Sequence, residues 1–335
     1  MRLLKSMEPE QPQRDQLAAP STAPASIPQE HRPNFGKRLL WGPNGLRAFW
    51  RLLIFALLVV GLQFAVALLL HRHPIRHFTP LTVLVQDSIA FLVTLVAAMI
   101  MARFEHRSVA DYGLPARGAF GVRFWEGLAW GFAAQCATML ILYVVGSASF
   151  HGVDQHGAAA IRYGLLWGLA FVAVGFFEEY LFRGYPQFTL ATGIGFWPAA
   201  IIISGLFWLG HMGNPGETWV GGFATAVAAM MFCVSLWLTG NLWFAIGLHA
   251  GWDWTETYFF GVPDSGMPAT GHFLNSSLSG PKWISGGTVG PEGSVIALLV
   301  LFSVIALLFL RFRKLHAGVQ YLRPSPQQDS TDTPA

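Results

Sequence analysis

The sequence predicts an all-α polytopic membrane protein with about eight transmembrane helices. Of its 335 residues, 53% are hydrophobic and only 12% are charged, whereas about a quarter of the residues in soluble domains are charged. Its apolar runs extend over about 20 residues, the length of helix that crosses a bilayer. These runs are continuous and lack the period-two alternation of transmembrane β-strands, which excludes a β-barrel.

Eight apolar runs account for the predicted spans. The first four are residues 52–70, 81–102, 127–146 and 163–182. The last four are residues 196–210, 219–238, 242–261 and 294–310.

The two ends of the chain have a different composition. Residues 1–46 are rich in Pro, Gln, Ser and charge, and such a segment buries too little apolar surface to fold. Residues 316–335 form a second polar tail. We therefore expect a helical membrane domain over residues 47–315 between two disordered tails.

The positive residues predict the orientation of these spans. With eight spans, 17 of the 21 Lys and Arg residues fall in the tails and connections on one side, and Lys and Arg are enriched on the cytoplasmic side. Both termini are therefore expected in the cytoplasm, with the chain in the inner or plasma membrane. Residues 262–293 would form a long external loop, either a lid or a connection, and we favour a connection because no chemical motif stands in it.

Ionisable residues within apolar spans indicate where function is to be sought, because such a residue is costly in lipid unless it is paired or lines a cavity. Asp87 and Glu126 are isolated and are interpreted as structural. The fourth, fifth and seventh spans are different, because they carry Glu178, Glu179, Arg183, His211, His249, Asp253 and Glu256.

The spacing of these residues predicts which of them meet. Glu179 and Arg183 are four residues apart, which favours an ion pair on one helix face, while Glu178 points about 100° away. Glu178 and His211 lie 16 and 17 residues from Ile194 in the connecting turn. In an antiparallel hairpin both would therefore lie at the same height, about 25 Å from the turn.

The seventh span carries a polar stripe. His249, Asp253 and Glu256 fall at positions i, i+4 and i+7, which places them on one face of a helix. Their height matches that of Glu178 only if the hairpin of spans four and five protrudes into the cytoplasm by about 11 Å. On that condition, a catalytic cavity is expected among helices four to seven.

Three motifs then reveal a resemblance to a known family. The segments E-E-Y-L-F-R, F-W-L-G-H and H-A-G-W-D, in this order and each on a hydrophobic span, resemble the CPBP family. It includes type II CAAX prenyl endopeptidases and Abi-like, bacteriocin-processing relatives, which are intramembrane proteases. The resemblance covers about residues 163–260.

The resemblance implies roles for the matching residues. Glu178 would be the catalytic glutamate with His211 and His249 as partners, and Glu179 and Arg183 would support them. At Asp253 the family most often has Asn. Because an aspartate donates a hydrogen bond only when it is protonated, an oxyanion role transferred to Asp253 is in doubt.

Two hydrolytic mechanisms fit these residues. In the first, Glu178 and His211 activate a water molecule, and His249 with position 253 stabilises the oxyanion. In the second, His211 and His249 with a carboxylate hold a Zn²⁺ ion that activates the water. Glu178 would then be a ligand or the base, and Asp253 would orient His249 or be a ligand. The sequence lacks an H-E-x-x-H motif, and we favour the metal-independent mechanism, leaving Zn²⁺ as the open alternative cofactor.

Two functions of other classes are also compatible with the sequence. One is a non-proteolytic membrane scaffold of the same fold, which the departure at Asp253 suggests. The other is a proton- or ion-coupled transporter, for which no inverted repeat is visible. The expected partners are a peptide or protein substrate at the membrane and the lipid bilayer, without nucleic acid, and the resemblance leaves open whether the substrate is prenylated.

Overall fold

A computed structural model of the chain describes residues 39–42, 45–70, 78–268 and 270–313. Most of the predicted N-terminal tail, residues 1–38, and the predicted tail at residues 316–335 lie outside the described residues. The described end of the N-terminal segment forms a minimal hairpin. Its strands β1 (Trp41–Gly42) and β2 (Gly45–Leu46) pair antiparallel directly before the first long helix.

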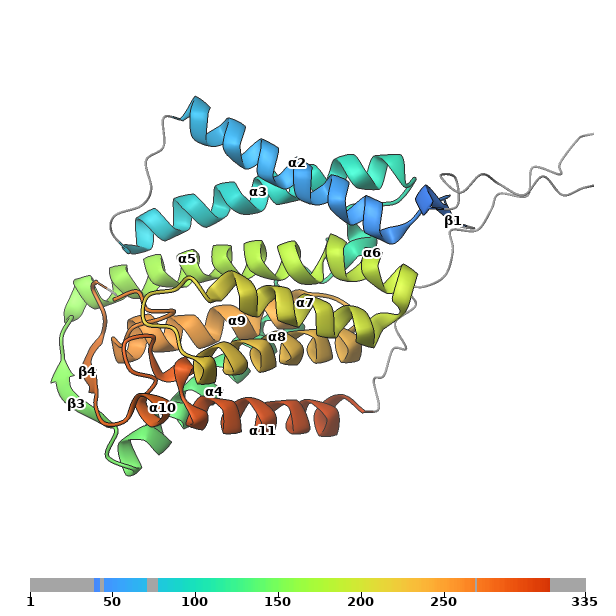
Figure 1. Ribbon diagram of the computed structural model, residues 1–335. Coiled ribbons are helices and arrows are strands. Elements are labelled where there is room, and N and C mark those ends of the chain that lie inside the picture. Colours follow the sequence, from blue (N-terminus) through green and yellow to red (C-terminus); the bar gives the residue numbers. More distant parts are fainter. Residues whose placement is uncertain (1–38, 43–44, 71–77, 269, 314–335) are drawn as a thin grey trace, which may run out of the picture.

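The described part of the chain is an all-α membrane domain, as predicted from the apolar runs (Figure 1). Six of its helical segments are long and apolar enough to cross a membrane. They are α2 (Ala48–Leu69), α3 (Pro80–Phe104), α4 (Val122–Val144), α5 continuing into α6 (Gly157–Ile194), α8 (Trp219–Thr239) and α11 (Val295–Phe312).

The fifth predicted span, residues 196–210, is helical over the predicted range but too short to count among these six, and the seventh, residues 242–261, is divided into two helical elements. Helix α7 (Phe196–His211) has 16 residues, and α9 (Trp243–Trp254) has 12 before it changes into the π-helical turn η2 (Thr255–Phe260). All residues from Trp243 to Asp253 are buried. Since other helices surround α9, the apolar residues of this run pack against protein, and apolar composition alone overestimated the number of full-length spans.

The helix that contains the fourth predicted span, residues 163–182, ends directly after it. Helix α5 (Gly157–Arg183) ends at Gly184, and α6 (Tyr185–Ile194) starts immediately afterwards with Pro186 in its first turn. Proline has no backbone N–H and disfavours the α conformation in the residue before it, so the chain changes direction here. The turn into α7 then falls at Gly195, whose φ of +85° favours glycine.

Close backbone packing of α4 against α9 positions the polar residues of α9. A Cβ atom added to Gly247 would lie 2.0 Å from the carbonyl oxygen of Phe124, and one added to Gly131 would lie 2.1 Å from that of Leu248. These glycines therefore allow the two helix backbones to touch. Gly205 has no atom within 4 Å of an added Cβ, so small size has no such function there.

The expected external loop is structured. Strand β4 (Leu274–Leu278) pairs antiparallel with β3 (Ala148–Val153), which connects α4 to α5. The loop also contains the short helices α10 (Lys282–Ser285) and η3 (Pro291–Gly293). Figure 1 shows β3, β4 and α10 gathered at one end of the bundle, where β4 contacts η2. At the opposite end, the 3-10 helix η1 (Val109–Tyr112) follows α3.

Candidate active site

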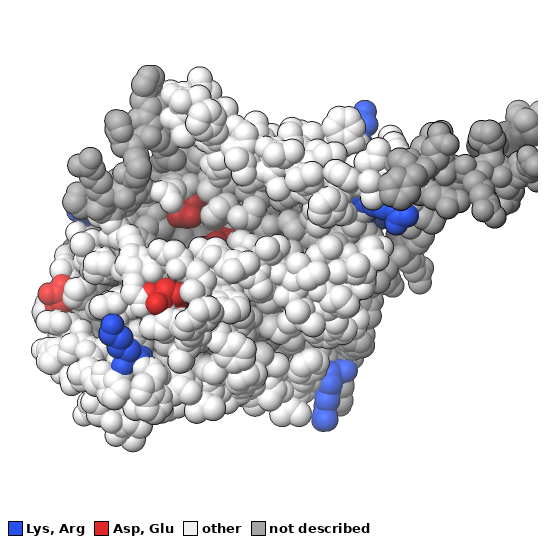
Figure 2. Space-filling model, in the orientation of Figure 1, with Lys and Arg blue, Asp and Glu red and all other residues white. Residues whose placement is uncertain are grey.

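A cavity of about 610 Å³ lies among α3, α5, α7, α8, α9 and the loop before α11. Figure 2 shows acidic side chains inside a recess of this face. The cavity has the size of typical ligand pockets, which range from about 300 to 1,000 Å³. Its ionisable lining residues are Asp87, Glu178, His211, His249, Asp253, Asp264 and Glu292.

His249 is held from behind by a buried carboxylate. Its Nδ1 atom lies 2.9 Å from Oε1 of Glu179, whose side chain is fully buried. Because a carboxylate only accepts hydrogen bonds, Nδ1 must be the donor. This hydrogen bond fixes the orientation of the imidazole ring, and Nε2 is left to face the cavity.

Arg183 neutralises Glu179, as the spacing of four residues predicted. Its Nη1 atom lies 3.2 Å from Oε1 of Glu179, and both side chains are completely buried. The guanidinium group also lies 4.3 Å from the ring centroid of Phe207 and 5.2 Å from that of Phe232. These aromatic faces provide further electrostatic stabilisation of the buried cation.

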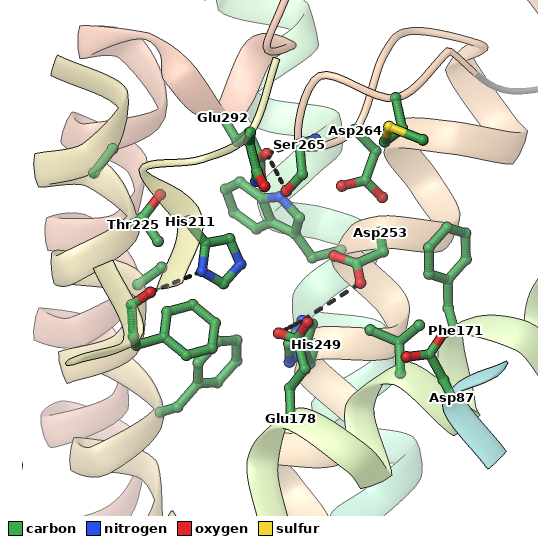
Figure 3. A pocket seen from close by; sticks show the side chains of 18 of the residues that line it. Asp87, Phe171, Glu178, His211, Thr225, His249, Asp253, Asp264, Ser265 and Glu292 are labelled. Atoms are coloured by element: carbon green, nitrogen blue, oxygen red, sulfur yellow. Dashed lines mark hydrogen bonds and ion pairs between the residues drawn. The ribbon is translucent and has the colours of Figure 1, made fainter. Parts of the chain in front are cut away.

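Glu178 occupies the other face of α5 and lines the cavity. Its Oε2 atom lies 3.7 Å from Nε2 of His249, and its side chain retains 23% exposure. Oδ2 of Asp253 lies 3.4 Å from the same nitrogen. Nε2 of His249 is thus close to two carboxylates, of which Glu178 is accessible from the cavity (Figure 3).

His211 reaches the same cavity from the end of α7. Its Nδ1 atom donates to the carbonyl oxygen of Phe207 at 2.8 Å, and the two rings stack with centroids 4.3 Å apart. In the neutral ring, Nε2 is then an acceptor. Figure 3 shows this ring directed toward the space above Glu178 and His249. The hairpin of α5, α6 and α7 therefore brings Glu178 and His211 to one cavity, as the counting of residues from the turn suggested.

Glu256 does not share the face of His249 and Asp253 that the sequence predicted. It is buried and does not line the cavity. Its Oε2 accepts hydrogen bonds from Nε2 of Gln135 at 2.7 Å and from Nε1 of Trp252 at 3.0 Å. The stripe assumed a continuous α-helix, but the helix becomes a π-helix at Thr255. A π-helical turn contains more residues per turn, so the face expected from 3.6-residue periodicity is lost.

Several lining residues were missed or misread from the sequence. Asp87, interpreted as structural, lines the cavity from α3, and the presumed connection contributes Asp264, Ser265, Met267 and Glu292. The only signal for the loop was its length, since loops longer than about 12–15 residues are often functional.

The two loop carboxyl groups are electrostatically strained. Burial raises the pKa of Glu292 to about 7, and the nearby Asp264 adds to this shift, whereas hydrogen bonds from Ser265 oppose it. Burial, followed by repulsion from Asp253, raises the pKa of Asp264 well above its usual range. Simultaneous ionisation of Asp264 and Glu292 is therefore unfavourable.

The described donor atoms at the cavity do not fit a bound metal ion. Within residues 39–42, 45–70, 78–268 and 270–313, no three His, Cys, Asp or Glu side chains are arranged to hold a metal ion. The proposed set of His211, His249 and Glu178 shares the cavity without converging on one point. These residues do not form a ready zinc site.

Fold and site together define a helical membrane protein with a carboxylate–histidine centre inside the bundle. Residues 160–255 match the family model described as type II CAAX prenyl endopeptidase, Rce1-like. This range contains Glu178, His211, His249 and Asp253 and confirms the resemblance found from the motifs. No curated protein and no solved structure gave a significant match.

Proposed function

We propose that this protein is an intramembrane endopeptidase in which Glu178, assisted by His211 and His249, activates water for attack on a peptide bond. The observation that carries this proposal is the accessible carboxylate of Glu178, 3.7 Å from an imidazole that the buried Glu179 and Arg183 hold in place. The peptidase class agrees with the family match over residues 160–255.

In the first step, a water molecule between Glu178 and His211 attacks the carbonyl carbon of the peptide. Glu178 accepts one proton from this water, and the acceptor Nε2 of His211 orients it. The carbonyl π electrons move to oxygen and form an oxyanion. His249, in its protonated form, donates from Nε2 toward this oxyanion.

In the second step, the tetrahedral intermediate collapses. The C–N bond breaks, the electron pair of the oxyanion re-forms the carbonyl, and Glu178 returns its proton to the leaving nitrogen. The products are a carboxylic acid and an amine, so atoms and charges balance with one water molecule consumed. General acid–base catalysis of this type contributes about 10²–10⁴-fold to the rate.

Asp253 serves in this scheme as a positioning residue. Its Oδ2 atom lies 3.4 Å from Nε2 of His249, so its carboxylate faces the imidazole. A charged aspartate cannot donate to an oxyanion. The proposed function of Asp253 is therefore to orient His249, in place of the donor function open to asparagine.

The proposed substrates are peptides or proteins in or at the membrane, including CAAX-type C-termini with a lipidated cysteine. The family match and the six apolar helices support this class of substrate. We propose further that both chain termini face the cytoplasm in an inner or plasma membrane, because 17 of the 21 Lys and Arg residues would then lie on that side.

The proposal is tested by mapping new protein termini in membranes from cells that express the wild-type chain or Glu178→Ala at equal abundance. Cleavages that require Glu178 are expected and would identify the substrates. The matched control is Asp154→Asn, which removes a carboxylate from an exposed site outside the cavity lining. Identical terminus maps for wild type and Glu178→Ala, with good coverage of lipidated and membrane proteins, would refute the peptidase.

A further inference from the structure

The loop before α11 contributes two carboxylates that the proposed reaction does not use. Asp264 and Glu292 line the same cavity as Glu178 but belong to the segment after η2. Figure 3 shows both on the wall of the cavity beyond Asp253, on the opposite side from the backbone of Glu178. Both groups therefore border the same cavity as the proposed catalytic glutamate.

Local hydrogen bonds fix both carboxylates in place. Oε1 of Glu292 accepts from the backbone N–H of Ser265 at 2.7 Å and from its hydroxyl at 2.8 Å. Oδ2 of Asp264 accepts from the hydroxyl of Thr257 at 2.9 Å. In addition, the backbone N–H of Gly266 donates to the carbonyl oxygen of Val289 at 2.8 Å, which ties the two ends of the loop together. The positions of the acidic groups are therefore defined before a ligand arrives.

Each carboxylate keeps a second oxygen for a ligand. Within the described residues, Oδ1 of Asp264 and Oε2 of Glu292 have no hydrogen-bond partner, and neither is sealed from solvent. Asp264 is nonetheless only 7% exposed, so its residual accessibility is toward the cavity that it lines. A buried carboxylate with an unused oxygen needs a donor or a cation for full stabilisation.

The cavity provides no permanent cation for these groups. Its described lining contains five carboxylates and two histidines but no Lys or Arg. The buried guanidinium group of Arg183 is paired with Glu179. The carboxylates of Glu178 and Asp253 both face His249. Of the three remaining carboxyl groups, Asp87 belongs to α3, and Asp264 and Glu292 form the acidic pair of the loop.

We propose that Asp264 and Glu292 form a specificity subsite that binds the positively charged side chain of a Lys or Arg residue beside the cleaved bond of the substrate. This inference rests on the proposed peptidase function and adds a preference for basic residues. An ammonium or guanidinium group supplies the donors that the unused oxygens require, and charge-assisted hydrogen bonds of this kind are stronger than neutral ones. Peptides with a neutral or acidic residue at this position provide no positive charge to balance Asp264 and Glu292.

The test uses the full chain in proteoliposomes and fluorogenic peptides with a hydrophobic anchor. The peptides differ at one position at a time, with Lys compared to norleucine and Arg compared to citrulline. At one position, we expect kcat/KM to be about tenfold or more higher for the charged residue, the scale of a charged hydrogen bond. Because this comparison uses the wild-type protein, its result does not depend on the folding of any variant.

Variants then assign the preference to the loop. Asp264→Asn and Glu292→Gln are each expected to lower the ratio of charged to neutral kcat/KM, and the double variant should bring it close to one. Asp154→Asn, outside the lining of the cavity, should retain the wild-type ratio. Thermal unfolding in detergent verifies that each variant has folded.

The failures of the two proposals are distinguishable. A wild-type protein that cleaves these peptides with equal kcat/KM for charged and neutral residues at every position overturns the subsite but leaves the peptidase intact. A preference that persists in the double variant also overturns the assignment to Asp264 and Glu292. A wild-type protein that cleaves no peptide of either series counts against the peptidase and, with it, the subsite.

Discussion

Nδ1 of His249 donates a hydrogen bond to Oε1 of Glu179, 2.9 Å away, and the same oxygen lies 3.2 Å from Nη1 of Arg183. One buried carboxylate oxygen thus joins the imidazole at the cavity to a guanidinium group behind it. The neighbouring Glu178 remains accessible. Two adjacent glutamates on one helix therefore have different environments, which is the basis for different functions.

Replacing Glu179 by Gln should impair catalysis more than substrate binding. The amide can still accept from Nδ1 of His249, but it lacks the negative charge that stabilises a protonated imidazole. We expect kcat to fall by about 10²–10⁴-fold, with a smaller change in KM. Steady-state kinetics in proteoliposomes measure both quantities, and a variant with wild-type kcat would contradict the positioning function of Glu179.

Replacing Arg183 by Met should destabilise the folded protein strongly. Arg183 and Glu179 are both fully buried, and removing one member of a buried ion pair typically costs about 3–5 kcal/mol. The double variant Glu179→Gln, Arg183→Met should recover part of this loss, because no uncompensated charge remains. Denaturant unfolding in detergent measures the free energies of unfolding.

The matched control for Arg183 is Arg117→Met, since Arg117 is exposed. Surface substitutions of this type usually change stability by less than about 0.5 kcal/mol. Equal stabilities of the Arg183→Met and Arg117→Met variants would argue against a structural function of the buried pair.

Adding a methyl group at the contact of α4 with α9 should destabilise the bundle. In Gly247→Ala the new Cβ would lie 2.0 Å from the carbonyl oxygen of Phe124, and overpacking of this kind costs about 1–3 kcal/mol. Gly205→Ala is the control, because no atom lies within 4 Å of its added Cβ. Its stability should be unchanged or slightly higher, because alanine favours helix. The opposite order of the two Tm values would contradict the backbone contact.

Metal removal should leave activity intact. The described His, Cys, Asp and Glu side chains do not converge in a group of three that would hold a metal ion. We expect purified protein, dialysed against a chelator and shown by elemental analysis to contain far less than one zinc per chain, to retain its kcat. Loss of activity on chelation and its recovery on adding Zn²⁺ would establish the zinc mechanism instead.

The preference for basic residues should depend on pH. The pKa of Glu292 is raised to about 7, so this carboxyl group is mostly protonated at pH 6 and mostly charged at pH 8. The ratio of kcat/KM for Lys over norleucine peptides should therefore rise between these values. Using a ratio cancels any pH effect that changes the cleavage of both substrates equally. Glu292 interacts electrostatically with Asp264 and His211 and accepts hydrogen bonds from Ser265.

In the Glu292→Gln variant the remaining pH dependence of this ratio should be smaller. A wild-type ratio that is constant from pH 6 to pH 8 would show that ionisation of Glu292 does not control substrate selectivity. A ratio that falls with increasing pH would contradict the expected sign.

The amino-acid sequence by itself determined the class of fold and indicated several of the residues that line the cavity. Apolar runs report helices in a membrane because unpaired backbone groups are too costly in lipid, and rare ionisable residues inside them mark a site for a related reason. The pair of Glu179 and Arg183 followed from helical periodicity, and Glu178 and His211 were brought to one cavity by two helices joined by a short turn. These are local relationships, which spacing along the chain can predict.

Only the tertiary structure decided the contacts between distant segments. Periodicity could not reveal the π-helical turn that turns Glu256 toward Gln135. Composition could not show that α9 is enclosed by protein rather than lipid. Asp264 and Glu292 enter the cavity because hydrogen bonds and strand pairing fold the loop back onto the helical bundle. Such contacts depend on the packing of many segments at once, and no pattern within a single segment encodes them.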